Sequence, residues 1–246
     1  MLRKALNTSL TLVMISTGAI AGVTVTAGSA QAASNCGQPI TGLPLDQGSQ
    51  GTSVERLQIR VAGFVTSGEV LSTDGVYGTR TKEAVRKFQK QYGLQADGIA
   101  GSDTVNKIYS LQDSDCTPIH FSYAEWNKCN STWAGGAVSA TAAKANARKS
   151  MWKLEALRAK LGGGAVQISS GFRSNSCNAA VGGVTGSRHT YGDAADMPGS
   201  QSRRCDVHRA AKSSGFTEVL GQGFPGHNDH THVGMTSSRQ WHGCQG

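Results

Sequence analysis

The chain has 246 residues, with 24 Lys and Arg against 16 Asp and Glu and a formal net charge of +8. This length is enough for one large or two small domains. The basic residues are scattered and aromatic residues make up 6% of the chain, so the sequence lacks the basic stripe with interleaved aromatic residues that is typical of nucleic-acid binding. We therefore expect no nucleic-acid partner. The basic excess suits an anionic polymer, such as a cell wall that carries phosphate groups.

Residues 1–32 have the pattern of a secretory signal peptide. Two basic residues precede a mostly apolar run over 10–25, and Ala30-Gln31-Ala32 places small residues at the two positions that cleavage requires. Thr, Ser and Gly interrupt the apolar run, which disfavours a permanent membrane span. A lipid anchor on Cys36 is disfavoured because Asn35 before it is large and polar. We expect a mature protein that is secreted, extracellular or associated with the cell wall, has no membrane contact and is monomeric.

All six cysteines lie beyond this segment. An even number of cysteines in an exported chain predicts three disulfides, but six cysteines allow 15 pairings and their spacing does not choose among them. No two of them are spaced as C-x-x-C, which disfavours a cysteine-bound zinc and a thioredoxin-like redox site. The predicted disulfide cysteines are Cys36, Cys116, Cys129, Cys177, Cys205 and Cys244.

A short pattern occurs twice in the first half of the chain. D-G-[VI]-x-G-x-x-T is present at 74–81 and again at 97–104. The Asp-Gly pairs predict tight turns, because glycine tolerates positive φ, and apolar residues at helical spacing follow the first copy. A further helical face precedes the first copy, with Ser53 as its expected N-cap. The segment 48–109 is therefore predicted to form a compact three-helix unit.

A polar stretch over 112–118 predicts the boundary between a domain at 33–115 and a second domain at 116–246. In the second domain, apolar spacing predicts a long helix from Ala140 to Lys160, and alternating apolar residues predict a strand around 166–168. Short strands joined by glycine-rich connections follow. The predicted class is α+β: a small three-helix domain, then an α+β domain with a short mixed or antiparallel sheet.

Two stretches of the second domain carry four of the seven histidines. His189 and Asp196 are seven positions apart, and His227, His230 and His232 crowd into six residues. A catalytic zinc takes three protein ligands from His, Asp and Glu and keeps a fourth position open. The seven-residue spacing excludes a helical H-E-x-x-H site. In an extended strand His230 and His232 face the same side, so the spacing leaves open which histidine is the third ligand.

The first domain resembles the small peptidoglycan-binding domain of bacterial wall hydrolases. The likeness rests on "GTSVERLQIRV" at 51–61, "DGVYGTRTKEAVRKFQKQYGLQADGIAG" at 74–101 and the following Thr104. The resemblance implies peptidoglycan as the partner. A helical spacer without a ligand is the alternative interpretation.

The second domain resembles the zinc D-alanyl-D-alanine carboxypeptidases, whose superfamily includes lysostaphin-like endopeptidases and the hedgehog signalling domain. The motifs are "GFRS" at 171–174, "SRHTYGDAAD" at 187–196 and "GHNDHTHV" at 226–233. The resemblance implies one Zn²⁺ per chain. The ligands that it implies are His189, Asp196 and His232.

The same resemblance implies roles for the residues around the metal. Arg173 lies where the family has an arginine that contacts substrate, and His230 lines the site, where it would steady an oxyanion or the attacking water. The general base is either Asp229, three positions before the last histidine, or His227. The implied disulfides are Cys36–Cys116, Cys129–Cys177 and Cys205–Cys244.

Together these resemblances imply a secreted, zinc-dependent D,D-carboxypeptidase that hydrolyses the terminal D-Ala-D-Ala bond of peptidoglycan stem peptides, with crosslink cutting as a variant. One alternative is a wall-binding module with a non-catalytic zinc domain, in which His230 closes the metal site as a fourth ligand. The other is a lysostaphin-like endopeptidase. That branch generally spaces its first His and Asp four positions apart, against seven for His189 and Asp196 here, which favours the carboxypeptidase.

Overall fold

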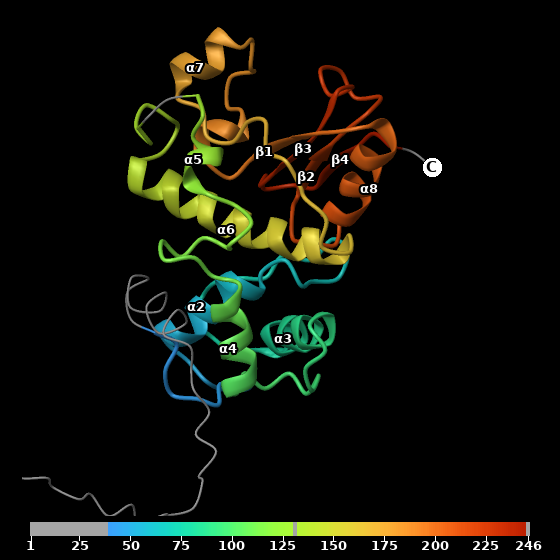
Figure 1. Ribbon diagram of the computed structural model, residues 1–246. Helices are drawn as coiled ribbons and strands as arrows, with labels where there is room; N and C mark the ends of the chain where they lie inside the picture. Colours follow the sequence, from blue (N-terminus) through green and yellow to red (C-terminus); the bar gives the residue numbers. More distant parts are fainter. Residues whose placement is uncertain (1–38, 130–131, 245–246) are drawn as a thin grey trace, which may run out of the picture.

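The computed structural model describes residues 39–129 and 132–244 (Figure 1). The predicted signal peptide and Cys36 lie outside the described residues. Within the described ranges, no helix has both the length and the hydropathy needed to cross a bilayer. The described chain forms a three-helix unit below a larger α+β unit in Figure 1, in agreement with the predicted class.

The three-helix unit consists of α2 (Thr52–Val61), α3 (Thr79–Gln91) and α4 (Ser102–Ser110), as the sequence predicts. The apolar faces of these helices meet in one core. The predicted N-cap is wrong, because α2 begins at Thr52 after Gly51 and has no side-chain cap. Instead, the hydroxyl of Ser53 accepts a hydrogen bond from the amide of Thr41, which fastens the incoming chain to the helix.

The first copy of the repeat is held by a buried glutamine of the preceding helix. Gln58 Nε2 donates to Asp74 Oδ1, to the carbonyl of Val76 and to Thr81 Oγ1 at 3.0, 3.0 and 3.1 Å. Its Oε1 accepts the amide of Gly75 at 2.9 Å. Gly75 has a φ of 74°, which favours glycine at this point of the turn.

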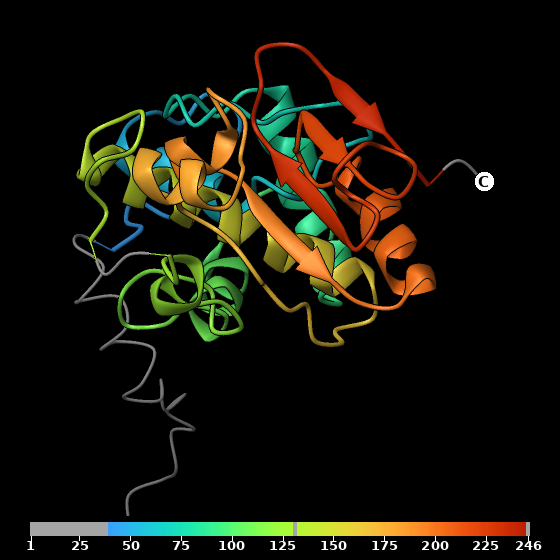
Figure 2. The same cartoon turned by 90° about the horizontal axis from the view of Figure 1, so that it is seen from above.

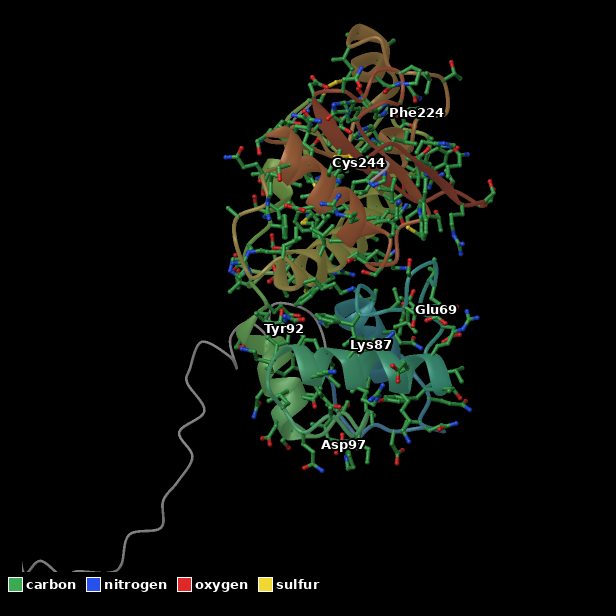
Figure 3. All side chains as sticks on the ribbon, turned by 90° about the vertical axis from the view of Figure 1, so that its right-hand side faces the viewer. Glu69, Lys87, Tyr92, Asp97, Phe224 and Cys244 are labelled. Atoms are coloured by element: carbon green, nitrogen blue, oxygen red, sulfur yellow. A yellow bond between two sulfur atoms is a disulfide. The ribbon has the colours of Figure 1, made fainter. Side chains whose placement is uncertain are left out.

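The second copy repeats this network atom for atom. Gln89 Nε2 donates to Asp97 Oδ1, the carbonyl of Ile99 and Thr104 Oγ1 at 2.9, 2.9 and 3.0 Å, and Gln89 Oε1 accepts the amide of Gly98 at 2.8 Å. Asp97 lies at the end of this unit that is farthest from the α+β unit (Figure 3). The repeated D-G-[VI]-x-G-x-x-T pattern thus marks two turns that are each fastened to the helix before them.

The α+β unit contains a small mixed sheet. Its strand order is β1-β3-β2-β4, in which β3 is antiparallel to β1 and β2, and β4 is parallel to β2. Figure 2 shows these strands gathered at one side of the molecule. The strands are β1 (Ala195–Pro198), β2 (Glu218–Leu220), β3 (His230–Gly234) and β4 (Gln240–His242).

The sheet packs against α8 (Gln201–Ala211) and α6 (Ala140–Lys160), and the other helices of this unit lie beyond them. The predicted long helix is present with the expected bounds as α6, and the side chain of Ser139 caps its N-terminus. The other helices of this unit are α5 (Tyr123–Trp126), α7 (Asn175–Ala180) and the 3₁₀ helix η1 (Arg188–Tyr191).

The predicted strand around 166–168 is wrong. This segment is extended, but it pairs with β1 only through the bridge between Ser170 and Asp196. Two residues later the amide of Phe172 donates to the carbonyl of Trp126 at 2.8 Å, so the chain has already left the sheet edge. The alternation of apolar residues therefore reflects one buried face of this segment. It does not indicate a strand, because no strand in the described part of the chain pairs with the segment along its length.

Helix α6 belongs to both units. Trp152 and Ala156 pack in the core of the three-helix unit, whereas other buried residues of α6 pack under the sheet. The approach is close, since a Cβ on Gly63 would lie 2.5 Å from that of Ala156. Lys160 Nζ also donates to the carbonyl of Gly63 at 2.9 Å. The two units are therefore packed against each other through a shared helix (Figure 1).

Two of the implied disulfides are present, Cys129–Cys177 and Cys205–Cys244. The second joins α8 to the chain after β4, which fastens the C-terminal part of the sheet to the helix beside it. The implied pair Cys36–Cys116 involves Cys36, outside the described residues.

Candidate metal centre

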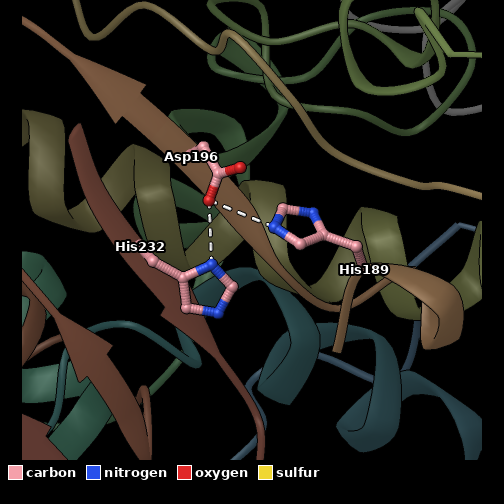
Figure 4. A group of neighbouring side chains, drawn as sticks. All are labelled: His189, Asp196 and His232. Atoms are coloured by element: carbon pink, nitrogen blue, oxygen red, sulfur yellow. Dashed lines mark hydrogen bonds and ion pairs between the residues drawn. The ribbon is translucent and has the colours of Figure 1, made fainter. Parts of the chain in front are cut away.

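Three side chains from separate elements converge beside the sheet (Figure 4). His189 comes from η1, Asp196 from β1 and His232 from β3, and one candidate ligand atom of each lies within 4.8 Å of the others. Asp196 and His232 are directly opposite in the β1–β3 register, so strand pairing alone brings them together. All three are buried, with 2%, 5% and 5% of their surface exposed.

The turn after η1 aims His189 at this pair. Gly192 has a φ of 80°, and a Cβ there would collide with the carbonyl oxygen of Ala143 in α6. Only glycine therefore lets the turn pack against α6 in this conformation. The seven residues from His189 to Asp196 thus contain the rest of the 3₁₀ helix, a turn at Gly192 and the first residues of β1.

The nitrogens of the two histidines face one carboxylate oxygen. Asp196 Oδ1 is 3.1 Å from His189 Nε2 and 2.8 Å from His232 Nδ1. His189 Nδ1 donates to the carbonyl of Gly171 at 2.6 Å, so in the neutral ring Nε2 carries a lone pair. A lone pair directed at a buried carboxylate is unfavourable unless a proton or a cation lies between them. This donor set suits a divalent ion such as zinc, which takes imidazole nitrogen and carboxylate oxygen.

The electrostatics agree with a cation site. Burial raises the pKa of Asp196, but the charges and hydrogen bonds of His189 and His232 outweigh it and hold that pKa well below its ordinary value. Burial lowers the pKa of His189. Burial also lowers the pKa of His232, but its hydrogen bonds to Asp196 and Glu218 outweigh this and raise it to about 9. The raised pKa means that the surrounding carboxylates favour positive charge at His232, and a bound divalent ion would supply that charge.

The structure places Arg173 at the same carboxylate. Its Nη2 donates to Asp196 Oδ2 at 2.6 Å, and its Nε donates to Ser170 Oγ at 2.8 Å. The side chain is 15% exposed, so it lies at the rim of the buried set. A guanidinium in this position can bind a carboxylate or carbonyl of a molecule that enters the centre.

The histidine-rich segment supplies two further imidazoles. His230 and His232 face the same side of β3, as strand alternation predicts, and His230 Nε2 is 3.5 Å from Asp196 Oδ1. The ring of His227 is 5.0 Å from that of His230 and 5.5 Å from that of His232, centroid to centroid. His227 Nδ1 donates to the carbonyl of Pro225 at 2.9 Å, which leaves Nε2 without a hydrogen in the neutral ring.

Asp229 lies at the exposed outer side of the centre and contacts one predicted site residue, His230. Its side chain is 89% exposed, and Oδ1 accepts from His230 Nδ1 at 2.7 Å. The carboxylate is therefore directed at the outer edge of the His230 ring. Across 39–129 and 132–244, the set His189, Asp196 and His232 is the group whose atoms are close enough to share one ion, and His230 is not part of it.

Sequence analysis missed one charged residue of the centre. Glu218 in β2 places Oε2 at 3.1 Å from His232 Nε2, and its side chain is 13% exposed. Burial raises the pKa of Glu218, but the hydrogen bond and charge of His232 outweigh this and lower it. Glu218 is 14 residues from His232 in the chain and belongs to no motif, so the pairing of β2 with β3 is the feature that reveals it.

Taken together, the α+β fold and a buried His-Asp-His set with an arginine and two more imidazoles at its rim define a metal-dependent hydrolase. The chain matches Peptidase M15 over residues 119–234 and the putative peptidoglycan binding domain over residues 50–108. This protein belongs to the peptidase M15 family and carries a peptidoglycan-binding domain.

Individual relatives agree with this assignment. The chain is 54% identical over 197 residues to the zinc D-Ala-D-Ala carboxypeptidase of Streptomyces albus G, which covers 80% of this chain and 77% of the relative. It is 39% identical over 66 residues to the N-acetylmuramoyl-L-alanine amidase CwlL of Bacillus licheniformis, which covers 25% of this chain and 18% of that protein. It is 37% identical over 73 residues to a spore cortex-lytic enzyme of Oceanobacillus iheyensis, with 29% and 25% covered.

Proposed function

We propose that this chain is a zinc-dependent D,D-carboxypeptidase that removes the terminal D-alanine from peptidoglycan stem peptides ending in D-Ala-D-Ala. The observation that carries the proposal is the convergence of His189, Asp196 and His232 on one buried point, in a chain 54% identical to a zinc D-Ala-D-Ala carboxypeptidase. The three-helix domain brings the enzyme to its polymeric substrate. We further propose that residues 1–32 direct export and that the mature protein is a monomer located at the cell wall. Its two domains span residues 33–115 and 116–246.

The ligands of the zinc ion are His189 through Nε2, Asp196 through its carboxylate and His232 through Nδ1. These atoms face one another, and the outer nitrogen of each imidazole is occupied by a separate partner. Zinc bound here supplies a Lewis acid that polarises the scissile carbonyl and activates a water molecule. Three protein ligands leave a position open for that chemistry, as catalytic zinc sites do.

Arg173 binds the substrate. A stem peptide that ends in D-alanine presents a free carboxylate, and the planar guanidinium matches it with two parallel hydrogen bonds. Arg173 is already held by Ser170 and Asp196 at the rim of the buried set, so little side-chain freedom remains to be lost on binding.

His227 is the general base, in preference to Asp229. Because His227 Nδ1 donates to Pro225, Nε2 is free to take a proton from the attacking water and to return one to the leaving amine. The carboxylate of Asp229 is exposed and engaged with His230, so its role is to orient His230 toward the centre. His230 then lies where it can donate a hydrogen bond to the developing oxyanion.

The activity is tested with the mature protein and a peptide that ends in D-Ala-D-Ala. We expect D-alanine to be released, the release to stop with a chelator and to return with zinc. A protein that sediments with purified wall but releases no D-alanine would be the non-catalytic binding module instead. Analysis of digested wall separates the variants, since an endopeptidase converts crosslinked muropeptides to monomers.

Two matched substitutions test the general base. His227→Ala removes the free Nε2 and is expected to lower the rate by about 10²–10⁴-fold at saturating zinc. Asp229→Ala removes only the outer partner of His230 and is expected to lower the rate less. The reverse order of the two effects would assign the base to Asp229.

A further inference from the structure

We propose that Glu218 is a positioning residue that holds the His232 ring with Nδ1 directed into the metal centre. This role rests on the proposed zinc site. It adds a fourth residue, Glu218, from a strand outside the sequence motifs.

His232 lies between two carboxylates. Its Nδ1 is 2.8 Å from Asp196 Oδ1, and its Nε2 is 3.1 Å from Glu218 Oε2. An ionised carboxylate accepts hydrogen bonds and does not donate them, so Nε2 carries the hydrogen that bonds to Glu218. The neutral ring then has its lone pair on Nδ1, on the side of Asp196 and His189.

His189 is held by the same principle with the opposite nitrogen. There a backbone carbonyl, that of Gly171, accepts from Nδ1 at 2.6 Å and leaves the lone pair on Nε2. Each imidazole thus has an outer acceptor that selects its tautomer and fixes its ring, as outer partners of metal-binding histidines do. Glu218 differs from the carbonyl of Gly171 because it also adds a negative charge next to the ring, which strengthens the binding of a cation.

The fold contains a slot for this carboxylate. Glu218 is opposite Gly234 in the β2–β3 register, and a Cβ on Gly234 would lie 2.6 Å from Glu218 Oε2 and 3.1 Å from the Cβ of Arg188. Gly234 has no positive φ that would require glycine. The missing side chain therefore provides the space through which Glu218 reaches diagonally along β3 to His232.

Within the part of the chain that the structure describes, the Glu218 carboxylate makes its hydrogen bond to His232. The neighbouring cation, Arg188, directs its guanidinium to Asp193, with Nε 3.0 Å from Asp193 Oδ1. A buried carboxylate whose hydrogen bond is made to a ligand imidazole is placed to act on that ligand.

The test measures zinc affinity by competition with a chromophoric chelator, using the mature chain with its disulfides. Glu218→Ala is expected to weaken zinc binding by about 10- to 100-fold, the usual effect of losing an outer partner. Glu218→Gln retains an oxygen that accepts from Nε2, so it is expected to recover part of the affinity. Gly234→Ala leaves every charge in place but displaces the carboxylate, and it is expected to weaken binding in the same direction.

A matched control is available in α6. Glu155 is a buried carboxylate, with 2% of its side chain exposed, and it pairs with His120 at 2.9 Å, but neither residue belongs to the metal centre. Glu155→Ala should leave zinc affinity unchanged while it lowers the melting temperature of the zinc-free protein. Melting of each zinc-free variant separates a loss of folding from a loss of zinc.

NMR of the His232 ring nitrogens provides a measurement that would not change if Glu218 only stabilised the fold. In the zinc-loaded unaltered chain we expect the Nε2 hydrogen of His232 to be hydrogen-bonded to Glu218. In zinc-loaded Glu218→Ala we expect the Nε2 and Hε2 signals of His232 to shift, because this hydrogen bond is lost. If folded Glu218→Ala and Gly234→Ala bind zinc as tightly as the unaltered chain, Glu218 is not a positioning residue. If the unaltered chain itself binds no zinc, the proposed function fails first, and the two failures are thereby distinguished.

Discussion

The glutamine networks of the three-helix domain and the metal centre of the peptidase domain are both buried polar clusters, but their donors and acceptors are balanced differently. Around Gln58 and Gln89, each amide hydrogen meets an oxygen and each oxygen meets a donor. Around Asp196, one nitrogen of His189 and one of His232 face the same carboxylate oxygen, Oδ1, which can only accept hydrogen bonds. A cluster that satisfies its own donors and acceptors supports a turn, whereas a cluster of converging acceptors needs a proton or a metal ion between them.

The largest effect is expected where a proposed zinc ligand is lost. Asp196→Asn keeps the shape of the side chain but removes the charge that attracts zinc and holds Arg173. We expect the release of D-alanine and the zinc content, measured by elemental analysis, to fall. The fall should exceed the loss of about 10²-fold that is the upper limit for removing an outer hydrogen-bond partner of a ligand. The matched change Asp74→Asn in the first repeat should leave both unchanged, and a zinc-replete, active Asp196→Asn protein would remove this residue from the ligand set.

The next effect concerns stability. Gln58→Leu and Gln89→Leu each leave a buried glycine amide without its acceptor, so each is expected to lower the free energy of unfolding by about 1–3 kcal/mol. The two networks share no residue, so in the double variant the losses should add. Urea unfolding measures this, and zinc affinity should not change. Unequal losses would show that the two repeats are alike in sequence but not in energetic role.

A pH dependence is expected at α6, where the two regions meet. Burial, the largest cause, lowers the pKa of Lys153 from 10.5 to about 8, with Lys149 acting in the same direction and Asp193 opposing it. Between pH 8 and 10.5 the native state therefore binds fewer protons than the unfolded state, and stability rises with pH by up to about 1.4 kcal/mol per unit from this group. Below pH 8 the group adds no slope.

Burial also lowers the pKa of Lys160 to about 8, so this residue adds a similar rise. Lys153→Met is therefore expected to reduce the slope of stability against pH by the share of Lys153, as measured by denaturant unfolding at pH 8, 9 and 10 against the unaltered chain. Lys149→Met is a control on the same helix, because it removes a nearby charge while Lys153 remains. An unchanged slope in Lys153→Met would mean that Lys153 keeps its ordinary pKa.

The smallest effect is expected on the surface of α3. Glu83 and Arg86 form an ion pair at 2.8 Å, but their side chains are 38% and 50% exposed. Water and salt screen such a pair, so Glu83→Gln should change the free energy of unfolding by less than about 1 kcal/mol. A larger loss of unfolding free energy, measured with urea, would mean that this surface pair stabilises the protein as much as the buried glutamine networks do.

Local patterns predicted much of the fold. The bounds of α6 follow from the spacing of its apolar residues, and the repeated Asp-Gly turns follow from the need for positive φ. The strand predicted around 166–168 failed because apolar alternation reports a buried face but not a pairing partner. The capping role of Ser53 failed because its hydroxyl bonds to Thr41, twelve residues away.

The sequence by itself determined which groups were available to bind zinc, since histidine and aspartate are its usual ligands and their clusters are visible in the chain. Only the tertiary structure decided which atoms meet: the β1–β3 register sets Asp196 against His232, and the pairing of β2 with β3 brings Glu218 to that ring. It also left Asp229 exposed with its carboxylate on His230, whereas the ring of His227 lies against that of His232. The physical reason is that ligand chemistry belongs to single residues, whereas tautomer, burial and distance depend on partners that are remote in the chain.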